Sequence, residues 1–332
     1  MNHSNHKPSC LIVGGGITGL IIAQNLQRNG IAATVLDKGR GIGGRLATRK
    51  VGTADKYGVF DYGAQYFSVK NPKFQTWVDE WLLAGIITEW SRGFNQTDRD
   101  YPRYRGVVSN RAIAKYMAQD LDIHTSTRVN QVNYQDEQWL VSTEQGQKFT
   151  GDFLAITAPI PQTLALLTNS EIAISPSIYT QLQQISYSPC IALLALLNKP
   201  STIPAPGGIF TETEPVAWLA DNQQKQISPE PAITLHGTAA FSSEYWDADD
   251  QEVAEIMLSA ANNWIERDSV IEYQIHRWRY SLAKPGFPEP YCYFPKLPLV
   301  LAGDGFIAPK IEGAALSAIA ASQYIRGYLS MG

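Results

Sequence analysis

Short apolar runs alternate with polar or glycine-rich breaks near both ends of the chain. The runs at 10–13 and 33–36 predict buried strands, and the run at 20–26 between them predicts a helix. Towards the other end, 297–302 predicts a further strand and 311–328 predicts a long helix rich in small residues. This succession predicts an α/β fold built on a parallel, Rossmann-type sheet.

The middle of the chain mixes helical and strand periodicities, with turn residues between the runs. Asn71 and Ser109 are predicted to cap the first two helices of this region. Helices are predicted over 73–84, 110–121, 159–167, 176–185 and 249–267, and strands over 124–129, 153–157, 190–197, 216–220, 233–235 and 274–280. We therefore expect two domains: a discontinuous FAD-binding domain of residues 1–70, 105–165 and 285–332, and a sheet-plus-helix substrate domain of residues 71–104 and 166–284.

The first predicted strand runs into a glycine-rich turn. Gly14, Gly16 and Gly19 fit the pattern G-x-G-x-x-G, and Ile17 and Thr18 open the helix. The first glycine allows a tight turn, the second allows a phosphate to approach the backbone, and the third allows the helix to pack on the strand. The N–H groups at the helix start then face a pyrophosphate. The turn therefore predicts dinucleotide binding.

An acidic residue and a second glycine-rich loop distinguish between the possible dinucleotides. Asp37 ends the second strand. Its spacing along the chain from the glycine-rich turn is that of an acid that binds ribose hydroxyls. Its neighbours Lys38 and Arg40 would suit the 2′-phosphate of NADP. The next loop contains Gly44 and Arg45, for which a nicotinamide enzyme has no evident need. FAD is longer and extends past the first helix. We therefore expect the glycines to let the protein backbone approach FAD, and Arg45 to neutralise phosphate.

The C-terminal end carries further features that suit a flavin. Gly303 and Asp304 follow the last predicted strand, where an acid can bind a polyhydroxyl chain such as ribityl. Glu312, Gly313 and Ala314 then open the last helix. If this helix start faces the flavin, its N–H groups stabilise negative charge on the reduced ring.

Composition narrows the class of protein. The 332 residues carry a formal net charge of −4 with both signs interspersed, which argues against nucleic acid or an anionic membrane as the main partner. Cys10, Cys190 and Cys292 give neither a disulfide framework nor a zinc pattern, so we expect a reducing, cytoplasmic location. The start at 1–9 lacks the apolar core of a signal peptide, and the longest apolar stretch, 190–197, is too short to span a bilayer.

Several short motifs occur in an order that is similar to a known family. Beyond the first fingerprint, they are GGR at 43–45, D-x-G-A-Q at 61–65, LHGT at 235–238, WRY at 278–280, GDG at 303–305 and EGA at 312–314. Together they resemble the amine-oxidase superfamily of flavoproteins, and within it the renalase-like branch, which is also compact. The resemblance covers residues 1–70 and 278–332 and is thinner between them.

The resemblance implies a non-covalent FAD in a p-hydroxybenzoate-hydroxylase-like two-domain fold. It implies that Val129 contacts the adenine end, and that Cys292 does not match the family's pattern for covalent flavin attachment. It also implies that renalase-like members oxidise dihydro-isomers of NAD(P)H and pass the electrons to oxygen, while other members oxidise amines. Further expected FAD contacts are Gly63, Ala64, Gln65, Thr157 and Ala158.

Substrate-binding residues are expected on the second sheet, because flavin chemistry requires orientation of the substrate and not a nucleophile. His236 could bind an amide or phosphate or assist proton transfer, or it could be a core histidine bonded to a backbone carbonyl. Arg279 could grip an anionic group, or stack structurally. The aromatic residues that could line the pocket, or simply pack in the core, are Tyr66, Phe67, Trp218 and Tyr280.

No metal is expected, since His3, His6, His124 and His276 show no ligand spacing. The leading interpretation is an FAD-dependent oxidase that transfers a hydride from a dihydronicotinamide dinucleotide to flavin N5, with molecular oxygen as acceptor. An FAD enzyme for an amine or another apolar substrate is the second interpretation. A flavin-binding redox sensor without turnover is the third, and a plain NADP dehydrogenase is the fourth.

Overall fold

The computed structural model describes residues 7–94, 101–211 and 214–330, which form two compact units. Unit 1 takes the described residues of Met1–Gly44, Ala114–Ser186 and Ala283–Gly332. Unit 2 takes those of Arg45–Ile113 and Tyr187–Leu282. His3, His6 and most of the polar start lie outside the described residues. Residues 45–70, expected in the FAD-binding domain, lie in unit 2.

Unit 1 is built on a six-stranded sheet in the order β17-β18-β11-β1-β2-β7. All neighbours are parallel except β17 and β18. Every residue of β11 is buried, as expected for a parallel strand covered on both faces. The fold is therefore α/β with a Rossmann-type domain. The strands are β1 (Ser9–Val13), β2 (Ala32–Leu36), β7 (Asp122–His124), β11 (Phe153–Ile156), β17 (Cys292–Phe294) and β18 (Leu297–Leu301).

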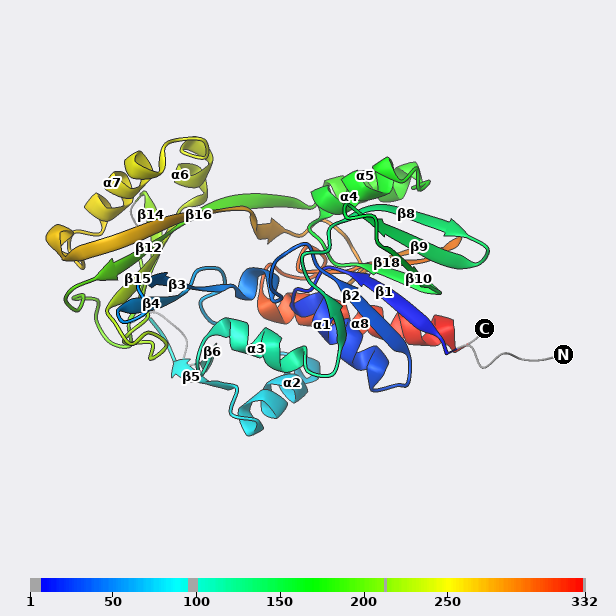
Figure 1. The fold of residues 1–332 in the computed structure, drawn as a ribbon, viewed down its shortest axis with the longest axis horizontal. Coiled ribbons are helices and arrows are strands. Elements are labelled where there is room, and N and C mark those ends of the chain that lie inside the picture. The colour runs from blue at the N-terminus through cyan, green and yellow to red at the C-terminus, as the bar shows by residue number, and fades with distance from the viewer. Residues whose placement is uncertain (1–6, 95–100, 212–213, 331–332) are drawn as a thin grey trace. The chain divides into compact units, whose positions relative to one another are not determined.

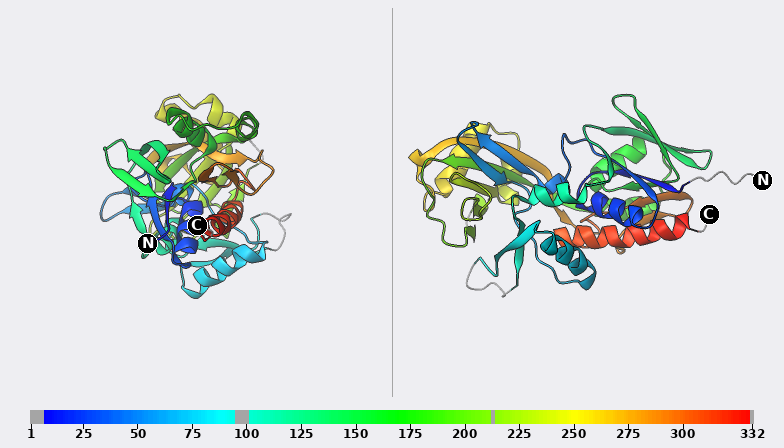
Figure 2. Two further views of the ribbon diagram at one scale, coloured as in Figure 1. Left: turned by 90° about the vertical axis from the view of Figure 1, so that its right-hand side faces the viewer. Right: turned by 60° about the horizontal axis from the view of Figure 1, so that its bottom comes forward.

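Two long helices cover one face of this sheet, α1 (Ile17–Gln27) and α8 (Ile311–Leu329), which lie side by side (Figures 1 and 2). Asn25 of α1 donates to the Ser322 hydroxyl of α8 at 2.9 Å. A small sheet of β8 (Val129–Gln135), β9 (Gln138–Thr143) and β10 (Lys148–Gly151) covers the other face, followed by α4 (Ile160–Asn169) and α5 (Pro176–Gln183) (Figure 1).

Unit 2 contains a five-stranded antiparallel sheet in the order β13-β14-β15-β12-β16. Alternation along its strands gives it two apolar faces. Leu193 and Leu235 face α6 and α7, while Leu194 and Ala232 face the hairpin of β3 and β4. The elements are β3 (Thr48–Gly52), β4 (Tyr57–Asp61), β12 (Ser186–Leu197), β13 (Gly208–Phe210), β14 (Val216–Asp221), β15 (Ala232–Gly237), β16 (Val270–Lys284), α6 (Ala239–Glu244) and α7 (Asp250–Ala260).

The remaining elements of unit 2 are α2 (Pro72–Leu83) and the hairpin of β5 (Ile87–Ser91) and β6 (Arg103–Gly106). Helix α3 (Asn110–Met117) and the 3-10 turn Gly44–Leu46 cross the boundary between the units, and a second 3-10 turn spans Arg267–Ser269. The predicted cap of α2 is confirmed, because the Asn71 side chain accepts a hydrogen bond from the Lys73 N–H and Pro72 begins the helix.

Three predicted elements run past the ends that the structure shows. The strand expected over 124–129 is the end of β7 and the start of β8, separated by Ser126 at φ 54°, which an extended strand cannot contain. The helix expected over 110–121 ends at Met117, before Asp120 at φ 63°. The helix expected over 249–267 ends at Ala260, ahead of two asparagines that favour turns over helix.

Candidate functional site

The glycine-rich turn in unit 1 has the geometry that a pyrophosphate requires. Gly14 adopts φ 112°, and a Cβ on Gly19 would lie 2.0 Å from the Gly14 carbonyl oxygen, so neither position accepts a side chain. A Cβ on Gly16 would meet no atom within 4 Å, so the backbone here is open to a ligand. No side chain caps α1, whose first N–H groups therefore stay available for an anion.

The second glycine loop and the end of β11 brace this turn. Gly43 forms a parallel bridge with Gly16, and its N–H donates to the Gly15 carbonyl at 2.8 Å. The Thr157 hydroxyl lies 3.1 Å from the carbonyl oxygens of both Val13 and Gly14. The structure thus brings Thr157 and the adjoining Ala158 against the glycine-rich turn.

Asp37 is held by backbone groups on both sides. Its two carboxylate oxygens accept from the N–H of Gly15 at 2.5 Å and of Gly39 at 2.6 Å. Lys38 instead extends to α4, where its ammonium donates to the Gln162 side chain at 2.9 Å. The acid is therefore fixed beside the glycine turn. Val129 lies at the start of β8, after the loop in which Thr127 N–H donates to the Asp37 carbonyl at 2.8 Å.

The start of α8 meets the start of α1 directly. The Thr18 hydroxyl donates to the Ala314 carbonyl at 3.3 Å. A Cβ on Gly313 would lie 2.2 Å from the Ala308 carbonyl oxygen, so this position must be glycine. Lys310, the N-cap residue of α8, makes no side-chain capping hydrogen bond, and Glu312 lies in the first turn of the helix. Asp304 is buried after β18, and the Gly303 N–H donates to the Ser317 hydroxyl at 2.9 Å.

The other predicted FAD contacts lie together in unit 2. A Cβ on Gly63 would lie 2.1 Å from the Arg45 carbonyl oxygen, and the Ala64 N–H donates to that oxygen at 2.8 Å. The Arg45 guanidinium donates to the Ser281 carbonyl at 3.0 Å. The Gln65 amide donates to the Asp61 carbonyl at 2.6 Å. Through these contacts Arg45 and the residues of D-x-G-A-Q hold one another's backbone in place.

His236 and Trp218 are neighbours on the sheet of unit 2. The two residues are directly paired across β14 and β15. His236 Nε2 lies 3.1 Å from the Tyr62 carbonyl oxygen, and burial lowers its pKa to about 4, so the ring is neutral near pH 7. Since a carbonyl oxygen only accepts, Nε2 carries the proton and Nδ1 is the acceptor. Trp218 is 4% exposed, and its Nε1–H has no hydrogen-bond partner among the described residues.

Strand β16 carries two other predicted substrate residues, Arg279 and Tyr280. Trp278 Nε1 donates to the Tyr62 carbonyl at 2.8 Å, on the side of β4. Arg279, the next residue along, points to the opposite face, where its guanidinium lies 4.7 Å from the Trp246 ring. The structure therefore does not bring Arg279 together with His236; it shows the stacked arrangement. Tyr280 contacts the Tyr187 ring at 5.5 Å.

The predicted aromatic walls divide into two groups. Tyr66 packs against Trp218 at 5.8 Å and Phe94 at 5.0 Å, in a cluster that also includes Trp90 and Phe210. Phe67 is buried against Phe74 and Trp81 and belongs to the core.

Sequence reasoning missed a buried ion pair. Lys225 and Asp61 are both fully buried, with the ammonium 2.8 Å from the carboxylate and 2.8 Å from the Gln65 carbonyl. Burial lowers the pKa of Lys225, while Asp61 opposes this effect. The only signal in the sequence was the buried-looking acid of D-x-G-A-Q, which needs a partner when buried.

Two features are absent from the described residues. No group of three or more His, Cys, Asp or Glu side chains could hold a metal ion there. Likewise, none of the described helices is both long and apolar enough to cross a membrane. Burial raises the pKa of Cys292 to about 12, so its thiol is not ionised near neutral pH.

Taken together, unit 1 has the donor set and the open backbone that the dinucleotide part of FAD requires: uncapped helix starts, glycines at Gly14, Gly16 and Gly19, and an acid fixed beside them. Comparison with known proteins agrees. A sequence model for flavin containing amine oxidoreductases matches residues 93–326, and one for NAD(P)-binding Rossmann-like domains matches residues 12–81.

Individual relatives cover nearly the whole chain. Mouse (Mus musculus) renalase is 26% identical over 344 residues, spanning 96% of this chain and 99% of renalase. A redesigned triple mutant of a putrescine oxidase superposes with a TM-score of 0.73 at 12% identity, covering 97% of this chain and 99% of its own. The wild-type putrescine oxidase bound to putrescine gives 0.68 at 12% identity, with coverages of 97% and 99%. These two structural matches show the fold.

Proposed function

Because the chain belongs to the flavin containing amine oxidoreductase family and is an FAD-dependent oxidoreductase, we propose that it oxidises dihydronicotinamide dinucleotides, the isomers of NAD(P)H, with oxygen as acceptor. Bound FAD supplies the hydride-accepting N5 of the flavin. The likeness to renalase over the full chain supports the substrate class. FAD contacts by Arg45, Gly63, Ala64, Gln65 and Val129 are part of this proposal.

One observation carries the proposal: Trp218 and His236, each of which has a polar side-chain atom, are directly paired on neighbouring strands. Trp218 Nε1–H has no partner among the described residues, and His236 Nδ1 is the acceptor left by the bond of Nε2 to Tyr62. Directly paired residues on antiparallel strands have Cβ atoms about 5 Å apart. A primary carboxamide, which the nicotinamide ring carries, offers an acceptor oxygen and an NH2 donor on the same carbon atom. It is the complement of this pair.

Amine oxidation is the alternative, and the aromatic cluster around Trp218 favours it in part, since aromatic faces attract cations. In this chain, however, a cation already occupies the cluster. The Arg103 guanidinium lies 5.9 Å from the Tyr66 ring centre and 5.5 Å from that of Phe94. A protonated amine would be repelled there, so we expect poor turnover of amines such as putrescine.

The experiment is a substrate panel in air, with peroxide production as the readout. We expect peroxide from dihydronicotinamide isomers, at least a hundredfold slower production from putrescine, and none from NADH of the ordinary form. Faster turnover of putrescine than of the isomers would replace this proposal with the amine alternative. A flavin that reacts with neither would favour the redox-sensor interpretation.

A further inference from the structure

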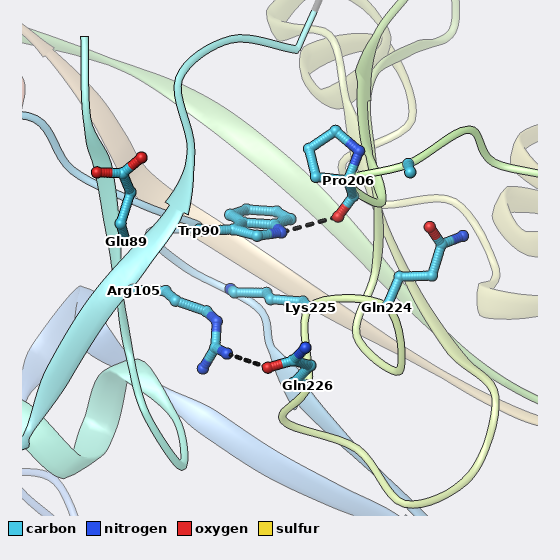
Figure 3. A pocket seen from close by; sticks show the side chains of 8 residues that line it. Glu89, Trp90, Arg105, Pro206, Gln224, Lys225 and Gln226 are labelled. Atoms are coloured by element: carbon cyan, nitrogen blue, oxygen red, sulfur yellow. Dashed lines mark hydrogen bonds between the residues drawn. The ribbon is translucent and has the colours of Figure 1, made fainter.

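Unit 2 contains a pocket of about 320 Å³ that none of the assignments above uses (Figure 3). Its wall includes Trp90 of β5, Arg105 of β6, and Pro206, Gln224, Lys225 and Gln226 from the loops on either side of β13 and β14. At roughly 30 Å³ for each liquid water, this volume corresponds to about ten waters. The pocket therefore suits a small molecule rather than a dinucleotide.

The pocket wall holds one positive charge in excess. Arg105 is 5% exposed and Lys225 is fully buried. The acid whose charge acts on both cations is Asp61, which lies 2.8 Å from the Lys225 ammonium. Two cations and one carboxylate leave a single uncompensated charge in a region shielded from water. Desolvation of this kind disfavours the charged state unless a counter-charge is present.

The guanidinium of Arg105 also has an unmet donor. Its Nη1 donates to the carbonyls of Gly106 and Val107 at 2.9 Å each, and its Nη2 donates to the Gln226 side chain at 3.1 Å. Its Nε is buried and has no hydrogen-bond partner within the described part of the chain. Buried polar groups almost always have partners, so this one points to a ligand.

Two further residues define the shape of the ligand. Trp90 Nε1 donates to the Pro206 carbonyl at 2.9 Å, which fixes the indole as a flat apolar wall (Figure 3). Glu89 also lines the pocket, but its carboxylate is bonded to Arg92 at 3.0 Å and points away from Arg105 in Figure 3. The one acid at the rim is therefore already paired, and it leaves the cationic wall to the ligand.

We propose that this pocket binds a small organic monoanion: a carboxylate on a flat apolar body, with a carboxylate oxygen accepting from Arg105 Nε and the body lying against Trp90. A single negative charge matches the single excess positive charge. A charge-assisted bond to a guanidinium is among the stronger hydrogen bonds in proteins.

The test is calorimetric titration of the FAD-bound protein with benzoate. Benzamide, benzylamine and inorganic phosphate serve as ligand controls. The first two keep the ring and lose the negative charge, whereas phosphate keeps a negative charge and lacks the ring. We expect benzoate to bind one to one, at least tenfold more tightly than each control, with no change in the flavin absorption spectrum. Arg105→Met should weaken benzoate binding at least tenfold.

A second variant keeps the test valid if Arg105→Met does not fold. Glu89→Gln changes an exposed rim residue, removing its negative charge and its ion pair with Arg92, so it should tighten benzoate binding about twofold to threefold. Equal binding of benzoate and benzamide would overturn the proposal, as would benzoate affinity unchanged by Glu89→Gln. Benzoate binding that perturbs the flavin spectrum and survives Arg105→Met would place the ligand at the flavin, which also overturns it.

Discussion

Trp218 and His236 are directly paired across β14 and β15, and the bond of His236 Nε2 to Tyr62 leaves Nδ1 as the acceptor of the ring. The Trp218 Nε1–H is buried and has no hydrogen-bond partner among the described residues, a state that costs about 1–3 kcal/mol. The His236 ring is neutral, because burial holds its pKa near 4, and its Nε2 proton is committed to the Tyr62 carbonyl. Substrate that satisfies both atoms recovers free energy that the empty protein loses.

Replacing Trp218 with Phe removes the donor and keeps an aromatic wall. We expect KM for dihydronicotinamide isomers to rise roughly tenfold, which is about 1.4 kcal/mol of lost binding. The free energy of unfolding should change by less than about 1 kcal/mol, because the loss of packing is offset by removal of an unsatisfied N–H. Steady-state kinetics measures the change in KM, and urea denaturation measures the change in the free energy of unfolding. An unchanged KM would exclude Trp218 from substrate recognition.

Two substitutions of His236 separate its two nitrogens. The amide of His236→Gln can still donate to the Tyr62 carbonyl but places nothing at the position of Nδ1, whereas that of His236→Asn can place an oxygen near Nδ1. We expect kcat/KM to fall about tenfold to a hundredfold in the Gln variant and less in the Asn variant, a difference of about 1–2 kcal/mol. The reverse order would show that the histidine serves only to hold Tyr62.

Stability should depend on pH through two histidines. Burial lowers the pKa of both His236 and His276 to about 4, from 6.5 in the unfolded chain. Between pH 6.5 and 4 the unfolded chain binds protons that the folded chain does not, so the free energy of unfolding falls as pH falls. It is undiminished above pH 6.5. Urea denaturation at pH 7, 5.5 and 4.5 should show a shallower fall in His236→Gln and in His276→Gln than in the parent. If the free energy of unfolding fell equally steeply with pH in the variants and the parent, burial would not be lowering the pKa of these two histidines.

Gly16 and Gly19 should respond oppositely to alanine. A Cβ on Gly16 enters open space, so Gly16→Ala should fold normally but bind FAD roughly tenfold more weakly or worse. A Cβ on Gly19 meets the Gly14 carbonyl oxygen at 2.0 Å, so Gly19→Ala should destabilise the protein by about 1–3 kcal/mol or more. Thermal melts of the FAD-free proteins, followed by titration with FAD, distinguish the effects. Unaltered FAD affinity in Gly16→Ala would contradict a pyrophosphate at this turn.

The pair of Lys225 and Asp61 should show strong coupling. Lys225→Met takes away the ammonium that lies 2.8 Å from the buried Asp61 carboxylate and should cost about 3–5 kcal/mol of unfolding free energy. The double variant with Asp61→Asn should recover part of this loss, because the carboxylate that lost this partner is gone. A double-mutant cycle in urea measures the coupling. Simple additivity would mean that the two groups do not interact.

Much of unit 1 could be predicted from the sequence, because its signals are local. Gly14, Gly16 and Gly19 mark the turn between β1 and α1, and the apolar run 297–302 marks β18. The small sheet β8–β10 was harder. Four of the seven residues of β8 are exposed, among them Gln131 and Asn133, so this strand carries little apolar alternation.

The site in unit 2 was less predictable, because it depends on strand faces and on contacts far apart in the sequence. His236 and Trp218 were identified by residue type, but their direct pairing depends on a register shift between Val216 and Trp218. The stacking of Arg279 on Trp246 could have been predicted from alternation, since Arg277 shares its face and binds the backbone of Trp246. Lys225 lies in a turn whose polar composition predicts solvent exposure, and its carboxylate partner, Asp61, is 164 positions away.

The most direct test of the central claim is anaerobic stopped-flow reduction of the FAD-bound protein by a mixture of dihydronicotinamide isomers. We expect the absorption band of the oxidised flavin to bleach after mixing, at a rate that rises with isomer concentration and drops at least tenfold in His236→Gln. Flavin that stays oxidised in the presence of the isomers, yet is reduced by putrescine, would contradict the proposed function.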